Sequence, residues 1–250
     1  MKKYKIETHC HSAYSFDCNV PVESVAQHSA SKGIDFLVLN DHDRCGLTPE
    51  DRSLFTEKGI HVLSAIEFTT QEGIHIIGIH PAIKTLEQEA FHYSVPEIMD
   101  SLTTLEAFII LPHPCHETGL LGQRKVSPQS RDYALSRAHF IETDNYRYGP
   151  TKGIAEIREK YPRLRLIIGS DAHSSTDIGA FQNVFEAPDD LPDPMQAFYA
   201  SESIEFLRTK KHGRGYWRMR KLKKSSLYQS LLKLFPAGLR RKIKNRLFHR

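Results

Sequence analysis

The sequence predicts an α/β barrel, and two observations carry this prediction. Seven short β-rich runs alternate with helix-like segments between residues 4 and 169, and repeated strand–helix alternation is typical of a parallel sheet that closes into a barrel. Histidines and acids follow directly after these runs, and in such barrels the functional groups come from the C-terminal ends of several strands. A length of 250 residues is enough for one undivided barrel with a full hydrophobic core.

The elements follow in order along the chain. The runs with strand composition are Tyr4–Thr8, Asp35–Asn40, His61–Ile66, Ile74–Ile79, Ala107–Leu111, His139–Thr143 and Arg165–Gly169. Helical spacing or helix-former composition, often with a proline near the start, marks Val22–Lys32, Pro49–Lys58, Pro96–Thr104, Pro128–Ser136 and Lys152–Tyr161. The short connection from Glu67 to Ile74 contains Gln-Glu-Gly and predicts a hairpin. The Pro/Asp-rich run Ala187–Pro194 predicts a loop, followed by a helix from Met195 to about Lys211.

The charge distribution divides the chain into a barrel domain, residues 1–212, and a C-terminal tail, residues 213–250. The net charge of +4 conceals the division, because all 30 acids precede Arg208 and 16 of the 34 basic residues lie from Arg208 onward. In the tail, Leu239, Ile243 and Leu247 recur at helical spacing among Lys and Arg. We therefore expect basic amphipathic helices that bind an anionic membrane surface or nucleic acid. The alternatives are a tail folded onto the acidic body or left without structure.

Cysteine content and hydropathy indicate the cellular compartment in which the protein is expected. Four cysteines without CxxC spacing form neither a disulfide framework nor a thiolate zinc site. No stretch approaches the ~20 apolar residues that a membrane span needs, and no apolar run follows the first lysines. We expect a cytoplasmic protein, with peripheral membrane attachment through the tail as one alternative.

The residues that carry chemistry begin with His9 and His11, which lie two apart on a strand and therefore point to the same side. Similar residues follow at later strand ends, in Asp41-His42-Asp43, Glu67, His75, His113 and Asp171-Ala-His173. Gathered nitrogen and carboxylate donors bind divalent cations, and this mixture favours Mn, Fe or Zn over Mg or Ca. The sequence therefore predicts a multinuclear metal centre, and we interpret the chain as a metalloenzyme.

These motifs together resemble the PHP (polymerase and histidinol phosphatase) phosphoesterases. They are THCHS at 8–12, LNDHD at 39–43, IEF around Glu67, HIIG at 75–78, LPHP at 111–114 and GSDAH at 169–173. The resemblance implies a distorted seven-stranded, TIM-like (β/α)7 barrel with up to three metal ions at its mouth. Its implied ligands are His9, His11, Glu67 and Asp171 for one ion, Glu67, His75 and His113 for a second, and Asp17, His42 and His173 for a third.

Two of these ligands have rivals in the sequence. Asp17 lies six residues after His11, whereas small members of the family often have the acid at five, where this chain has Phe16. His80 competes with His75. We favour His75 because Ile-Ile-Gly follows it, as in the family, whereas His80 precedes a proline like a turn residue.

The metal set predicts hydrolysis of a phosphomonoester or short phosphodiester. Two cations that share a bridging hydroxide can clamp the attacking and leaving oxygens of an in-line displacement, and Glu67 suits the bridge because its two oxygens can each take one ion. A third ion would bind the remaining phosphate oxygens. We expect Glu67, Asp171 and His173 to be catalytic. The expected substrate is a small phosphorylated compound, a nucleotide or an oligonucleotide.

Substrate contacts and alternative functions stay open at this level. Arg44, Arg124 and Arg147 can grip a phosphate or be ordinary surface residues, and Asn145 is placed to line the substrate pocket. Glu142 can serve the pocket or the strand end, and His116 can protonate a leaving group or be an ordinary loop histidine. Asp41 and Asp43 can orient imidazoles or cap turns. The alternative functions are a barrel amidohydrolase acting on an amide or lactone, and a metal-stabilised binding module without activity.

Overall fold

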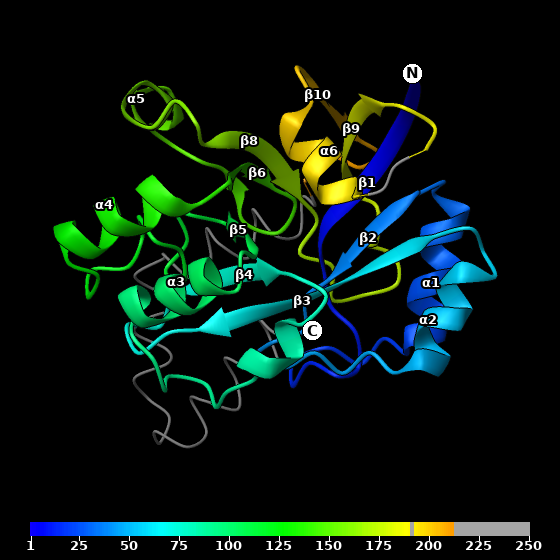
Figure 1. The fold of residues 1–250 in the computed structure, drawn as a ribbon, viewed down its shortest axis with the longest axis horizontal. Coiled ribbons are helices and arrows are strands. Elements are labelled where there is room, and N and C mark those ends of the chain that lie inside the picture. The colour runs from blue at the N-terminus through cyan, green and yellow to red at the C-terminus, as the bar shows by residue number, and fades with distance from the viewer. Residues whose placement is uncertain (191–192, 213–250) are drawn as a thin grey trace, which may run out of the picture. The chain divides into compact units, whose positions relative to one another are not determined.

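Ten strands form one curled sheet in the described part of the chain, residues 1–190 and 193–212 of the computed structural model (Figure 1). The strands are β1 (Lys2–Cys10), β2 (Phe36–Leu39), β3 (His61–Thr69), β4 (His75–Ile79), β5 (Phe108–Leu111), β6 (Phe140–Asn145), β7 (Gly149–Pro150), β8 (Arg165–Gly169), β9 (Phe181–Ala187) and β10 (Ile204–Arg208). Their order is β10-β9-β1-β2-β3-β4-β5-β6-β7, and β8 pairs with β6. A first compact unit spans Met1–Thr209. The predicted tail, residues 213–250, lies outside the described residues.

The helices lie in the connections between strands, close to where the sequence predicts them. They are α1 (Val22–Ser31), α2 (Pro49–Thr56), α3 (Val95–Thr104), α4 (Pro128–Arg137), α5 (Ile154–Lys160) and α6 (Pro194–Ala200), with a 3-10 helix η1 (Ile83–Leu86). Thr48 begins α2 with a capping box to Asp51, and Ser94 begins α3 in the same way with Glu97. No helix in the described ranges is long and apolar enough to cross a bilayer.

The sheet is mixed, although the alternation of elements predicts a parallel one. All seven predicted strands are present, but β4 runs antiparallel to both β3 and β5. The predicted hairpin explains this, because the five residues between Thr69 and His75 return the chain directly beside β3 without a crossover helix. The barrel is also not closed by a continuous ladder. In the described residues, the segment after β8 meets the end of β1 through one isolated bridge, Cys10 to Ala172.

The segment after α5 differs most from the prediction. The prediction of one helix from Met195 to about Lys211 is wrong, because α6 ends at Ala200 and β10 follows. Strand β10 pairs antiparallel with β9, a strand that the sequence analysis did not predict. The open edge of β9 supplies backbone partners that favour an extended conformation for Ile-Glu-Phe-Leu-Arg over a continued helix. The loop expected over Ala187–Pro194 is observed in its described part, between the end of β9 and the start of α6.

Two apolar clusters cover the two faces of the sheet, and a bulge in β1 decides which residues face the interior. Tyr4 and Ile6 belong to the interior cluster with Phe140 and Phe198, whereas Cys10 belongs to the cluster under the outer helices. Residues of equal parity on a regular strand share one face. The register between β1 and β2 shifts between Glu7 and Cys10, where β1 holds one extra residue. This bulge reverses the alternation and turns His9 towards the interior.

Candidate metal centre

The nine predicted ligands converge at one end of the sheet because of its topology. Strands β1, β2, β3, β5 and β8 share one direction, so their C-terminal ends lie at the same edge. β4 runs the other way, and its first residue, His75, therefore lies at this edge opposite Thr69. All nine occur in four sets whose ligand atoms lie within 4.8 Å of one another: His11, Asp17, His42 and His173; His9, His11 and Glu67; His9, His113 and Asp171; and His42, Glu67 and His75.

Glu67 lies at the middle of this arrangement. Its Oε2 atom is 3.3 Å from His9 Nε2, 3.1 Å from His11 Nε2 and 3.6 Å from His42 Nε2. Its Oε1 atom is 3.0 Å from His75 Nδ1 and 3.2 Å from His113 Nε2. The two oxygens of one buried carboxylate thus face two different groups of imidazoles.

Asp171 is the second buried carboxylate of the centre. Its Oδ1 atom lies 3.8 Å from His9 Nε2, 3.6 Å from His11 Nε2 and 3.2 Å from His173 Nδ1. The Arg147 guanidinium is 3.5 Å from the same oxygen. Arg147 follows β6 and is the arginine that the fold brings to the ligand cluster.

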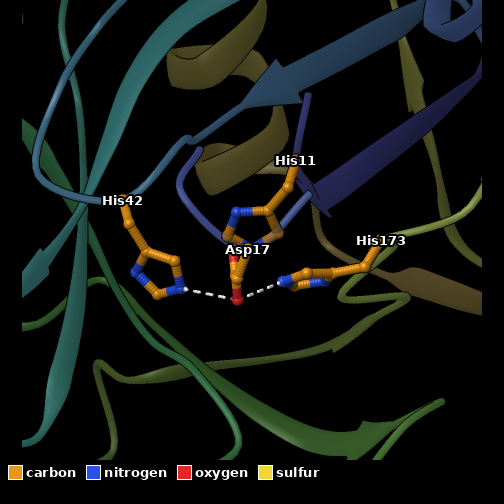
Figure 2. Close-up of side chains that lie close together, drawn as sticks. All are labelled: His11, Asp17, His42 and His173. Atoms are coloured by element: carbon orange, nitrogen blue, oxygen red, sulfur yellow. Dashed lines mark hydrogen bonds and ion pairs between the residues drawn. The ribbon is translucent and has the colours of Figure 1, made fainter. Parts of the chain in front are cut away.

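Asp17 completes the group nearest the solvent, shown in Figure 2. Its Oδ2 atom lies 2.9 Å from His173 Nε2 and 3.7 Å from His42 Nε2, and Ser15 donates a hydrogen bond to the other oxygen. The loop after β1 therefore brings Asp17 to the site despite its unusual spacing from His11. Phe16, which precedes it, is 81% exposed, and its ring lies beside the His42 ring at a centroid distance of 5.1 Å.

The imidazole nitrogens fit a cation better than they fit the protein alone. His9 Nδ1 donates to Glu142 Oε1 at 2.8 Å, so a neutral His9 presents the lone pair of Nε2 to the Glu67 carboxylate. His11 Nε2 and His75 Nδ1 also lie close to Glu67 and are buried without a hydrogen-bond partner in the described structure. Facing acceptors of this kind require either protons or a positive ion between them. The donor set therefore suits divalent metal binding.

The protein's own charges hold the carboxylates ionised. Burial alone would raise the pKa of Glu67, but the surrounding imidazoles of His75, His9 and His42 lower it well below its usual range. Burial likewise opposes the charge of Asp171, while His9 and Arg147 lower the pKa of that carboxyl. Both groups are thus available as anionic ligands at neutral pH.

The imidazoles divide into two classes. Burial, followed by the nearby His173, lowers the pKa of His11 to about 3, and burial also lowers the pKa of His42. His173 is also buried, but hydrogen bonds to Asp17 and Asp171 raise its pKa to about 9. Burial opposes the charge of His9 and His75, but the surrounding carboxylates, above all Glu67, raise the pKa of both imidazoles. Neutral imidazoles are ready to ligate, whereas those with a raised pKa have to release a proton first.

Glu142 is the functional residue whose role the sequence left open. One of its oxygens accepts from His9 Nδ1, and the other accepts from the His113 backbone N–H at 2.6 Å and from Asn145 Nδ2 at 2.8 Å. It therefore orients His9 and positions the backbone of His113, as outer carboxylates commonly do for metal-ligating histidines. Gly169 permits this approach, since a Cβ there would overlap Glu142 Oε1.

The backbone at the centre is strained. Three non-glycine residues in or beside the ligand set have positive φ: Asp43 at 59°, His113 at 29° and Asp171 at 51°. Such conformations cost about 1–3 kcal/mol each and concentrate at functional sites. Asp43 offsets part of this cost because its carboxylate accepts a hydrogen bond from Thr69 N at the end of β3.

Hydrogen bonds to residues outside the ligand set hold the predicted residues Asp41, Asp43 and Asn145. Asp41 accepts hydrogen bonds from the backbone N–H and the hydroxyl of Ser12, and Asp43 accepts one from Thr69 N. Both carboxylates therefore stabilise loops and do not orient imidazoles. The Asn145 amide is occupied by Glu142 and by the N–H groups of Arg147 and Tyr148.

Two predicted arginines and the rival histidine lie away from the ligand atoms. Arg44 lines a cleft beside His42, while Arg124 is exposed between β5 and α4 and has no side-chain hydrogen bond or ion pair to the described residues. His80 lies at the opposite end of β4 from His75 and lines a separate cleft with Arg52 and Tyr199.

A stacked pair of aromatic rings lies beside His113. The rings of His116 and Tyr148 stack with centroids 3.8 Å apart, and each also contacts the His113 ring, at 5.7 and 5.0 Å. His116 therefore lies beside the proposed ligand His113, whereas Tyr148 carried no signal in the sequence beyond its place after β6.

Comparison with curated proteins finds two distant relatives, although no family model matches the chain. A 5′-3′ exoribonuclease of Haemophilus influenzae is 34% identical over 95 residues, 35% of this chain. The match spans about a third of that relative, 34% of its length. A protein named "Probable phosphatase" in Acetivibrio thermocellus is 21% identical over 231 residues, covering 78% of this chain and 90% of the relative.

Solved structures share the fold at low identity. PsfC from Pseudomonas syringae has a TM-score of 0.61 at 16% identity and covers 92% of this chain and 100% of its own. A two-domain Bacteroides vulgatus protein containing a predicted PHP-like metal-dependent phosphoesterase has a TM-score of 0.58 at 19% identity, covering 74% of this chain and 58% of its own. Endonuclease Q, in complex with a duplex substrate bearing an abasic lesion, has a TM-score of 0.60 at 15% identity and covers 79% and 56%. The chain thus shares the α/β fold of these solved structures.

Proposed function

We propose that this protein is a metal-dependent phosphoesterase that hydrolyses a phosphomonoester or a short phosphodiester. The observation that carries the proposal is Glu67, whose two oxygens face His9 and His11 on one side and His75 and His113 on the other. Such a carboxylate suits a bridge between two cations. The similar proteins named above as phosphatase, exoribonuclease and endonuclease support the same class of reaction.

Up to three divalent ions, Mn, Fe or Zn, would be held by the residue sets described above. His9, His11, Glu67 and Asp171 would hold one, Glu67, His75 and His113 a second, and Asp17, His42 and His173 a third. When bound, such ions activate water and offset the negative charge that develops on a phosphoryl group.

The protein's own residues would prepare the reaction in three ways. Glu142 holds the His9 proton at Nδ1, which leaves Nε2 free to ligate. Arg147, close to Asp171 and 24% exposed, presents a guanidinium at the edge of the centre where a phosphate oxygen would lie. His116 stands near the ligands as a proton donor for the leaving group.

Metal analysis combined with a substrate panel tests the proposal. The purified protein should contain divalent metal and should hydrolyse p-nitrophenyl phosphate or its diester, but not matched amides or lactones. Glu67→Gln keeps the side-chain shape and should lower both metal content and turnover. We expect turnover to fall by at least ~100-fold, because loss of even an outer-shell partner costs about 10–100-fold.

Glu50→Gln, an exposed acid in the first turn of α2, is the matched control and should behave like the wild type. Cleavage of amides or lactones in preference to phosphoesters would favour the amidohydrolase alternative. A metal-replete protein with no turnover of any substrate in the panel would favour a binding module.

A further inference from the structure

A cleft of about 1070 Å³ opens beside His42, at the edge of the proposed metal centre. Three segments line it: residues 13–16 after β1, residues 42–44 after β2, and residues 87–90 with 92 and 93 between η1 and α3. Its volume lies slightly above the ~300–1000 Å³ range of ligand pockets. The cleft therefore has room for a large group attached to a phosphate at the centre.

Aromatic rings are exposed in this cleft. Phe16 is 81% exposed and its ring centroid lies 5.1 Å from that of His42, while Tyr93 is 42% exposed and contacts the His92 ring edge-on. A phenylalanine as exposed as Phe16 gains little from folding, because most of its apolar surface stays in water. Two such rings in one cleft offer flat apolar surface to a planar ligand.

Gln88 adds a hydrogen-bonding group without a partner. Its backbone N–H donates to the Asp43 carbonyl at 3.2 Å, which fixes the residue against the loop after β2. Both side-chain amide atoms are buried and have no hydrogen-bond partner in the described structure. A buried, unsatisfied amide is uncommon in folded proteins. Its neighbouring donor and acceptor match the edge of a nucleobase, above all that of adenine.

The charges of the cleft exclude a second phosphate as its main occupant. Asp43, Glu87 and Glu89 line it, and the Arg44 guanidinium, which has no hydrogen bond or ion pair to the described residues, is the one lysine or arginine side chain among the lining residues. A neutral planar ring can stack against Arg44 without meeting repulsion from the three acids. These features favour a base over a phosphate or sulfate group.

We propose that this cleft is a nucleobase subsite, where the base of a nucleotide stacks against Phe16 and Tyr93 and bonds through its edge to Gln88. The placement of the nucleotide's phosphate beside His42 rests on the proposed phosphoesterase function. The substrate class is accordingly a nucleotide or the terminal nucleotide of an oligonucleotide.

Binding calorimetry on the metal-loaded full chain tests this subsite independently of turnover when each ligand below is used as its phosphonate analogue, in which CH₂ replaces the bridging ester oxygen and no bond can be hydrolysed. Adenosine 5′-monophosphate and ribose 5-phosphate differ only in the base. The nucleotide should bind about tenfold more tightly, equal to ~1.4 kcal/mol, which is within the range for stacking of a base on an aromatic side chain. In Phe16→Ala this ratio should fall close to one.

Two further variants complete the test. Gln88→Leu should reduce the preference for the nucleotide over phenyl phosphate, since phenyl phosphate offers a ring without a hydrogen-bonding edge. Phe91→Ala removes an aromatic ring that is 60% exposed but does not line the cleft, and it should keep the wild-type ratio.

Equal affinity of the wild type for the nucleotide and ribose 5-phosphate, or an unchanged ratio in Phe16→Ala, would overturn the subsite. Phenyl phosphate binding as tightly as the nucleotide, with no effect of Gln88→Leu, would also overturn it in favour of a simple aryl pocket. Base-dependent binding without hydrolysis of any phosphoester would support the subsite while refuting the proposed function.

Discussion

Glu142→Gln is the substitution that examines the centre most closely without removing a ligand. The Glu142 carboxylate accepts three hydrogen bonds, from His9 Nδ1, the His113 N–H and Asn145 Nδ2. Glutamine has one acceptor oxygen, and its NH₂ group can only donate. The substitution keeps the size of the side chain but cannot satisfy all three donors.

Either orientation of the glutamine amide damages the centre. With its NH₂ towards His9, Nδ1 has to become the acceptor, which moves the imidazole proton to Nε2 and blocks that nitrogen as a ligand. With its NH₂ towards His113 and Asn145, two buried donors face another donor, at about 1–3 kcal/mol for each group left unsatisfied. We expect the metal affinity to fall about 10–100-fold, equal to ~1.4–2.7 kcal/mol.

Chelator competition measures this affinity directly at neutral pH. Glu205→Gln is the control, because that carboxylate is exposed on β10 and pairs with Lys3 at 2.7 Å. Its metal affinity should equal that of the wild type. If Glu142→Gln were indistinguishable from Glu205→Gln, the inference that Glu142 sets the His9 tautomer would be refuted.

Three further predictions concern the same centre. Asp17→Asn should lower the bound metal by one ion per chain in elemental analysis, because Asp17 contacts only the outer group with His42 and His173; loss of all metal would contradict this division. Gly169→Ala should lower the free energy of unfolding by about 1–3 kcal/mol, because the added Cβ would overlap the Glu142 carboxylate. Urea titrations measure this change, and an unchanged unfolding midpoint would count against the overlap. In chelator-treated protein, the raised His173 pKa of about 9 contributes stability that is complete below its unfolded pKa of ~6.5 and is lost as the pH rises through about 9. Metal affinity should rise over that window as the proton leaves. Both trends should be weaker in His173→Gln, where the raised pKa values of His9 and His75 remain.

Much of the site could be predicted from short stretches of sequence. A donor that directly follows an apolar run lies at a strand end, and the C-terminal ends of strands in such a fold meet. That rule alone predicted that His9, His113 and Asp171 lie close together. The unusual spacing of Asp17 and the rivalry between His75 and His80 needed the structure, because loop paths and strand direction depend on long-range packing.

The supporting residues were beyond the reach of the sequence. Nothing local distinguishes Glu142 from an ordinary strand acid, and its role appears only once β6 lies beside β8, where Gly169 leaves room for it. Arg147 and Arg44 likewise have similar sequence contexts, but only the former lies within reach of Asp171. The strands β9 and β10 were missed because an edge strand is stabilised by its neighbour more than by its own composition.

The sequence by itself determined which chemistry this protein can support: nine nitrogen and oxygen donors, ordered along the chain at the ends of apolar segments. The tertiary structure alone decided how those donors face one another. An extra residue in β1 turned His9 to the interior, the reversed direction of β4 brought His75 to the same edge as Glu67, and left-handed backbone at His113 and Asp171 placed two more ligands. The physical reason is that donor type is a property of each residue, whereas register, strand direction and strained backbone are maintained by the packing of the whole sheet.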